Sequence, residues 1–482
     1  MHTFHLLVTA GLALSLAATS AAQTLNCQQI AHVDRFPGAV TPTNNYAGVW
    51  GMVVNGKEYA LVTARTGTLV YDCSNPGSPV ELGFIAGAGG TSTPYFWREA
   101  NGMGNYAYVS SEHAAAQVID LAGATPTLAG TFGIRAHTVA VDPDTQRVWL
   151  NGGQAPRGGC NVYDLNTSAV NPTLAGSYGT DYVHDCYPYR GYAYLGQIFA
   201  GNVRILNTQA FPTLTIESTR TTPGAFTHNA WVNKAATIMV TADENHGGCL
   251  TFWDITFKSA PVQLSTWCSP TGATVHNAFI KGKICHTSSY SAGYYAVDIS
   301  DPANPQLIAS FDTSAQTNND YHGCWGCYPF QPSGVMYLTD MQTGFWIAKP
   351  TCGVPNDYGT GTAGTGGKTP AIDYAGGFAK VGRPTFGLEC TDLAPNAPTA
   401  LFIAAGQANV PVFGITVNID LGLPFVMLGA TASAQGAVTF GIPIPNVAGY
   451  GNVGFNAQVV TADANGPQGL AASRGFALTI CP

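Results

Sequence analysis

A strand-like segment recurs seven times within residues 67–349, at intervals of about 45 residues, and this repeat constrains the fold more than any other feature. Each copy is a run of apolar and β-branched residues; five copies end in Asp and one in Asn, and several are followed by turns containing Pro, Asn and Ser. The copies occupy residues 67–72, 115–120, 159–164, 202–207, 249–254, 293–298 and 344–349. A period of this length is typical of the four-stranded blade of a β-propeller. The sequence therefore predicts an all-β fold with a closed ring of seven blades over residues 23–350.

Composition agrees with a compact β protein and excludes some functional classes. Charged residues make up 10% of the 482-residue chain, hydrophobic residues make up 46%, and the net charge is −8. A chain this apolar can bury a large core, so intrinsic disorder is excluded. The 19 Lys and Arg residues form no basic run and are outnumbered by 27 Asp and Glu residues, so the electrostatic pattern of a nucleic-acid-binding protein is missing.

A second set of residues recurs at another phase of the same repeat. Its seven members are Trp50, Trp97, His137, His184, His228, His276 and His322, spaced 40 to 48 residues apart. Equivalent positions in the blades of a propeller lie on a circle around its axis, so we expect the five histidines to lie on one circle. If that circle is near the mouth of the channel, the histidines converge.

Imidazole and carboxylate groups at these phases predict a candidate metal site. Neutral imidazoles donate lone pairs, and carboxylates offset the charge of the ion. The candidate ligands are His137, His184, His228, His276, Asp185, Asp243 and Glu244. The ion expected is divalent: zinc, iron, copper, manganese or calcium. The alternative is that each histidine forms structural hydrogen bonds to the next blade.

The loop Asp243-Glu244-Asn245-His246-Gly247-Gly248 has two interpretations of its own. It is either a solvated turn or a metal-binding loop, since neighbouring side chains converge only outside a regular strand. The sequence contains no G-x-S-x-G, H-E-x-x-H or P-loop motif. Two functions stay open: a binding protein without catalysis, and a metal-dependent hydrolase or lyase with Asp243 or Glu244 as its base.

The first 22 residues have the pattern of an export signal. Residues 6–18 are apolar, and Ser20, Ala21 and Ala22 form a small-residue cleavage site, although no Lys or Arg precedes the apolar run. A buried N-terminal helix is the alternative. No later stretch has the roughly 18 apolar residues that a membrane helix needs. We therefore expect a secreted or cell-surface protein without a transmembrane segment after processing.

Twelve cysteines fit an oxidising compartment, where disulfides persist. We expect Cys390 to pair with Cys481 and, less strongly, Cys249 with Cys268. Cys324 and Cys327 have C-x-x-C spacing, which favours a structural bridge over a redox dithiol or half of a zinc site.

The composition and hydrophobic pattern of the sequence change after residue 350. Residues 351–377 are rich in Gly and Thr and predict a flexible linker. Residues 378–482 contain alternating apolar segments separated by Gly, Pro and Asn turns, which predict a small β-sandwich. We interpret this part as an adhesion, surface-association or sorting module, with a purely stabilising role as the alternative.

The repeats also carry a resemblance to a known family. Residues 28–350 contain, in order, Trp50-Gly51, Trp97-Arg98, Ala136-His137, His184-Asp185, His228-Asn-Ala-Trp231, His276-Asn277 and Val297-Asp-Ile-Ser-Asp-Pro302. This order and spacing resemble the choice-of-anchor B family, whose LVIVD-type repeats form a propeller. Asn207 and the Cys324/Cys327 pair depart from the pattern.

The resemblance implies export and attachment to the cell surface by a C-terminal device, and it implies no reaction. The expected partner is an extracellular or cell-surface protein or polysaccharide.

Overall fold

The computed structural model describes residues 24–36, 44–88, 97–315 and 321–482. The predicted export signal, residues 1–22, lies outside the described residues. Within them the regular structure is almost entirely β-strand, with five short 3-10 turns, so the prediction of an all-β fold is confirmed. No helix in these ranges is long and apolar enough to cross a membrane.

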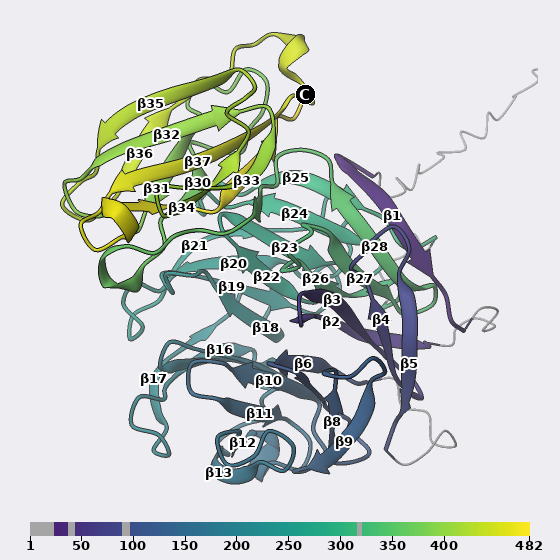
Figure 1. Ribbon diagram of the computed structural model, residues 1–482. Coiled ribbons are helices and arrows are strands. Elements are labelled where there is room, and N and C mark those ends of the chain that lie inside the picture. Colours follow the sequence, from purple (N-terminus) through teal and green to yellow (C-terminus); the bar gives the residue numbers. More distant parts are fainter. Residues whose placement is uncertain (1–23, 37–43, 89–96, 316–320) are drawn as a thin grey trace, which may run out of the picture.

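Seven four-stranded antiparallel sheets account for the described part of the chain up to Pro350 (Figure 1). The first two are β2 (Tyr46–Val54), β3 (Lys57–Ala64), β4 (Gly67–Asp72), β5 (Val80–Ala86), then β6 (Ala100–Met103), β7 (Tyr106–Val109), β8 (Ala116–Asp120), β9 (Thr127–Phe132). The next two are β10 (Thr138–Asp142), β11 (Arg147–Asn151), β12 (Cys160–Asp164), β13 (Thr173–Tyr178), then β14 (Asp185–Tyr189), β15 (Tyr192–Gln197), β16 (Asn202–Asn207), β17 (Thr215–Thr221). The fifth and sixth are β18 (Thr227–Val232), β19 (Ile238–Asp243), β20 (Leu250–Asp254), β21 (Val262–Trp267), then β22 (Ala278–Lys281), β23 (Ile284–Ser288), β24 (Tyr294–Asp298), β25 (Gln306–Phe311). The seventh is β26 (Cys324–Tyr328), β27 (Met336–Asp340), β28 (Gly344–Pro350) and, from the other end of the chain, β1 (Cys27–Val33).

The repeat seen in the sequence is the third strand of each sheet. These strands are mostly buried and rich in apolar residues because neighbouring sheets cover both of their faces; all five residues of β24, for example, are buried. The fourth strands lie at the outside and are more exposed, as in β5 and β9.

Contacts between the sheets run around a ring. The first strand of each sheet contacts the first strand of the next from β2 through β22; β23 then contacts β26, and β26 contacts β2. The seventh sheet contains both ends of this region, because β1 pairs antiparallel with β28 from Cys27 and Pro350 onwards. The first strands, with the residues just before them, therefore surround a common centre.

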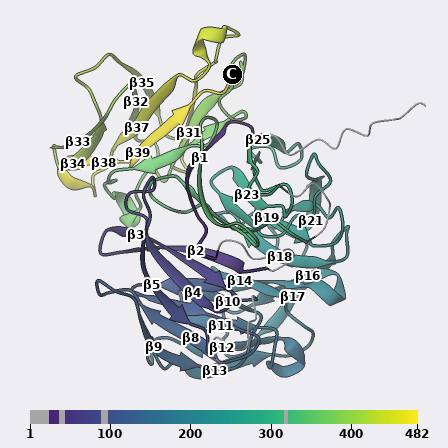
Figure 2. The same cartoon turned by 90° about the vertical axis from the view of Figure 1, so that its right-hand side faces the viewer.

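Residues after Pro350 form three further sheets beside this ring, near β25 in both views (Figures 1 and 2). The largest is β29 (Asn356–Tyr358), β39 (Gly475–Thr479), β37 (Gly454–Ala462), β32 (Pro398–Ala404), β35 (Phe425–Thr431), with β38 (Leu470–Ala472) paired to β37. The others are β30 (Ala371–Ala375), β31 (Gly387–Thr391), β36 (Val438–Gly441), and the pair β33 (Gln407–Val412), β34 (Ile415–Ile419). Both β29 and β30 lie within residues 351–377, so this stretch, expected to be an unpacked linker, contributes strands to these sheets.

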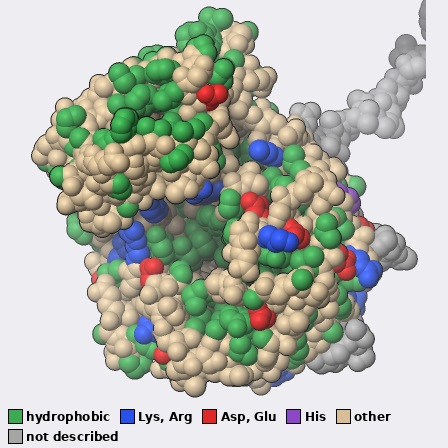
Figure 3. Space-filling view, in the orientation of Figure 1, with side chains coloured by type: hydrophobic (Ala, Val, Ile, Leu, Met, Phe, Trp, Pro, Cys, Tyr) green, Lys and Arg blue, Asp and Glu red, His purple; other side chains and the backbone are tan. Residues whose placement is uncertain are grey.

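The C-terminal sheets and the ring share a core. One cluster of buried side chains contains Tyr294 and Leu338 from the ring together with Phe378 and Leu478. Across the junction, the Tyr374 hydroxyl donates to Asp298 at 2.8 Å. In the space-filling view the surface is hollowed below the C-terminal sheets, and hydrophobic side chains line the hollow (Figure 3).

The cysteine predictions are partly right. Cys249 and Cys268 form the expected disulfide. The expected Cys390–Cys481 bond is wrong, because Cys481 bonds Cys352 and Cys390 is a buried free thiol on β31.

The Cys324–Cys327 bridge is also wrong, since both are free thiols on β26. Residues three apart in an extended strand are about 10 Å apart, beyond the reach of a disulfide.

Candidate functional site

Four of the predicted histidines meet at the centre of the ring. His137 and His184 immediately precede β10 and β14, His228 is the second residue of β18, and His276 lies two residues before β22. The ring centroids of successive histidines are 4.2, 4.2 and 4.1 Å apart. The repeat places them together because each occupies the same position at the start of an innermost strand. We call these four residues the histidine ring.

The fifth histidine does not join them. His322 does not contact the histidine ring, and its Nδ1 is 3.4 Å from Nε2 of Gln342. Trp325 on β26 continues the series instead, with its ring 4.3 Å from His276. The bulge in β26 between Cys324 and Gly326 alters the register at this point, which spacing in the sequence does not reveal.

Burial keeps the inner histidines neutral. Desolvation lowers the pKa of His184 and His228 far below its usual range, and it lowers the pKa of His276 to about 3. Nδ1 of His184, Nδ1 of His228 and Nε2 of His276 are buried without a hydrogen-bond partner. Buried polar atoms are normally paired, so these three nitrogens indicate a place for a ligand.

Glu244 lies against the histidine ring. Its carboxylate oxygens are 3.8 Å from Nε2 of His228 and 3.8 Å from Nε2 of His276. The Tyr290 hydroxyl donates a hydrogen bond to the same carboxylate. Burial raises the pKa of Glu244 to about 7. One ligand atom each from His184, His228 and Glu244 lies within 4.8 Å of the other two, so three predicted ligands share one locus.

His137 and Asp185 have protein partners of their own. Nδ1 of His137 is 2.6 Å from Glu112, and this contact lowers the pKa of Glu112. Asp185 accepts hydrogen bonds from Asn229 at 3.2 Å and from the backbone N–H of Cys186 at 2.8 Å. Both residues therefore border the three-residue locus without entering it.

The structure does not bring Asp243 to the locus. Its carboxylate accepts hydrogen bonds from the Thr222 hydroxyl and from the backbone N–H groups of Gly224 and Phe226. Asp243 ends β19, where consecutive side chains point to opposite sides, so Asp243 and Glu244 do not converge.

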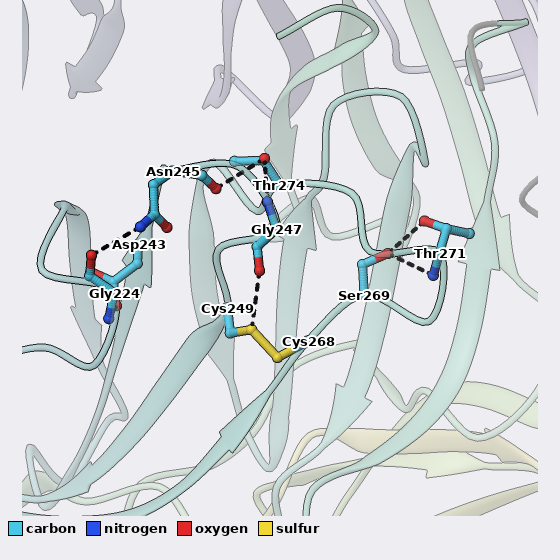
Figure 4. The surroundings of a disulfide bond; sticks show 9 residues. All are labelled: Gly224, Asp243, Asn245, Gly247, Cys249, Cys268, Ser269, Thr271 and Thr274. Carbon is cyan, nitrogen blue, oxygen red and sulfur yellow. Dashed lines mark hydrogen bonds between the residues drawn. A yellow bond between two sulfur atoms is a disulfide. The ribbon is translucent and has the colours of Figure 1, made fainter. Parts of the chain in front are cut away.

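The loop that carries Glu244 is fixed by the contacts drawn in Figure 4. Asn245 donates to the carbonyl of Gly224 at 2.9 Å, and its own carbonyl accepts from Thr274 at 3.0 Å. The Cys249–Cys268 disulfide fixes the residue that directly follows the loop. These contacts hold the Glu244 carboxylate toward the histidines.

Cavities lie on both sides of the histidine ring. The mouth is lined by Asn44, Trp97, His137, His184, Phe226, Glu244, Tyr290, Tyr321, Trp325 and Met341. The lining of the channel cavity includes Trp50, Glu99, His137, His184, Asp185, Tyr187, His228, Asn229, Trp231, Phe279 and Trp325. His137, His184 and Trp325 border both cavities.

Sequence reasoning missed Glu99, Tyr290 and Trp325. The Trp325 indole N–H donates to Glu99 at 2.7 Å, and the Trp325 carbonyl is 2.7 Å from Nδ1 of His276. Glu99 follows a member of the recurring set, Trp97, by two residues, and this spacing was the available signal. Tyr290 lies in a turn outside the repeat phase and gave no signal.

Comparison with known proteins identifies one copy of the repeat. The LVIVD repeat model matches residues 291–313, which contain β24 and β25. The match fits a repeat-containing protein of the β-propeller type. No curated protein gives a significant match to this sequence.

Proposed function

We propose that this protein is an exported binding protein of the β-propeller type that holds one divalent transition-metal ion in its channel. His184, His228 and Glu244 are the ligands, and His276 is the nearest further donor. The observation that carries the proposal is the cluster itself: three donor groups within 4.8 Å of one another, beside buried ring nitrogens that have no partner.

The donor set favours a transition metal over calcium. Imidazole nitrogens suit zinc, copper and iron, whereas calcium takes six to eight oxygen ligands. The histidines are already neutral, so the ion need not displace protons from them. Ligands around a zinc ion lie about 3.4 Å apart, so a modest inward rotation of the side chains completes the site.

The architecture is part of the same proposal. Seven four-stranded sheets with ring-like contacts support a seven-bladed propeller over residues 23–350, followed by a β-sandwich. Two disulfides support an oxidising, extracytoplasmic location, to which the signal at residues 1–22 directs the chain. Membership of the choice-of-anchor B family, and a surface protein or polysaccharide partner, complete the proposal.

The test is the metal content of matched variants. Purified protein is stripped with a chelator, reloaded with zinc, copper, iron or manganese in turn, and analysed for bound metal. We expect about one equivalent in the wild type and none in His228→Gln. His286→Gln is the control, because His286 is also a buried histidine with one unpartnered nitrogen, yet lies outside the ring. Equal metal content in folded His228→Gln and wild type refutes the site.

A metal-dependent hydrolase or lyase is the second candidate. One observation favours it: the mouth is lined by His184 and Glu244, two of the three residues of the locus, so a substrate in the mouth would lie beside the metal. Metal-loaded protein is screened with ester and phosphodiester substrates. Turnover that is lost in His228→Gln but kept in His286→Gln supports catalysis, and its absence from the loaded wild type favours binding alone.

A further inference from the structure

Two carboxyl groups line the channel cavity. Glu99 and Asp185 line it, and none of the described residues lining it is Lys or Arg. Burial raises the pKa of the Glu99 carboxyl to about 7. A cation in this cavity would stabilise both carboxylates.

The hydrogen bonds of the two carboxylates leave their charge in place. Trp325 donates to Glu99, while Asn229 and a backbone N–H donate to Asp185, and all three donors are neutral. Neutral donors orient a carboxylate without cancelling its charge. The cavity therefore favours a positively charged ligand.

The walls of the cavity indicate which kind of cation fits. Tyr187 stacks on Trp231 with ring centroids 3.5 Å apart, and Phe279 meets Trp231 edge-on at 4.8 Å. Trp50 lines the cavity as well. Aromatic side chains attract organic cations through their π electrons and also contact alkyl groups. A small, strongly hydrated metal ion uses such walls poorly.

The amide groups argue against a polyhydroxylated ligand such as a sugar. Asn229 donates to Asp185 and accepts from the backbone N–H of Ala278 at 3.1 Å. The side-chain oxygen of Asn101 accepts from the backbone N–H of Gly102 at 2.8 Å. A sugar requires several donors and acceptors of its own, and these amides already have partners.

We propose that the channel cavity binds a substituted-ammonium ion, with its charge against Glu99 and Asp185 and its alkyl groups against Trp50, Tyr187, Trp231 and Phe279. The site shares the walls formed by His184 and His228 with the metal locus, whose third ligand, Glu244, lies at the mouth.

Choline tests the proposal, with 3,3-dimethyl-1-butanol as its uncharged isostere. Binding is measured by isothermal titration calorimetry at pH 8, where the Glu99 carboxylate is ionised. We expect choline to bind and the isostere to bind at least tenfold more weakly, because the isostere lacks the charge that the carboxylates and aromatic rings attract. Equal binding of the two compounds, or no saturable binding of choline up to roughly 10 mM, overturns the proposal.

Glu99→Gln is the matched variant, because its amide oxygen can still accept from Trp325. We expect choline to bind it about tenfold more weakly, as loss of a charged partner predicts. Glu81→Gln on β5 removes the same charge outside the channel and should bind as the wild type does. An unchanged affinity in Glu99→Gln places any choline elsewhere and refutes the site. Glu244→Gln should lose metal but keep choline, because Glu244 lines the mouth and not the channel cavity, so the two proposals fail separately.

Discussion

Removing the Cys249–Cys268 disulfide tests how the loop of Glu244 is held. The bond closes a loop of 19 residues across β20 and β21. The entropy lost by the unfolded chain on closing such a loop corresponds to about 3 kcal/mol of stability. We therefore expect Cys249→Ala/Cys268→Ala to lower the free energy of unfolding by about that amount. Its metal affinity should also fall, because the loop that positions Glu244 loosens.

The second disulfide provides an internal comparison. Cys352 and Cys481 are 129 residues apart and enclose the whole C-terminal part, so the same relation gives about 5 kcal/mol for their removal. Cys390→Ala measures the packing cost of replacing a buried cysteine that forms no disulfide.

Guanidinium unfolding followed by circular dichroism gives the three stabilities, and elemental analysis gives the metal content. A cost for Cys249→Ala/Cys268→Ala equal to that of Cys390→Ala, with full metal retention, refutes the argument that the disulfide holds the loop.

Three further predictions concern the buried groups. The pKa of Glu99 and of Glu244 is raised to about 7 in the folded state, so the free energy of unfolding should fall as the pH rises from about 4.5 to 7. In Glu99→Gln and in Glu244→Gln, the free energy of unfolding measured in urea should depend less on pH over this range. A pH profile unchanged from that of the wild type contradicts the raised pKa values. Tyr290→Phe removes the hydrogen bond donated to Glu244, so the pKa of Glu244 should rise further, which infrared titration of the carboxyl band measures; a lower pKa would contradict the assigned donor. Phe252→Ala empties a fully buried position on β20 and should cost about 3 to 5 kcal/mol in chemical unfolding, whereas a cost below about 1 kcal/mol would show that β20 is not packed on both faces.

Periodicity in the sequence was sufficient to predict the repeated β-strands and to group part of the candidate site. The third strand of each sheet in the ring coincides with a repeated segment. A strand covered on both faces is rich in apolar residues, and this enrichment is visible in the sequence. His137, His184, His228 and His276 could be grouped because each occupies the same position in its repeat.

Contacts between distant segments were decided by the tertiary structure alone. The sequence does not show that Cys481 lies beside Cys352 rather than Cys390, nor that a bulge in β26 puts Trp325 where His322 was expected. The sequence predicted both Glu244 and Asp243 as ligands. Only the folded loop directs Glu244 to the histidines and Asp243 to backbone N–H groups. Repetition determines which residues are equivalent around an axis. Loops, bulges and turns have no period, so the atoms they bring together depend on packing in three dimensions.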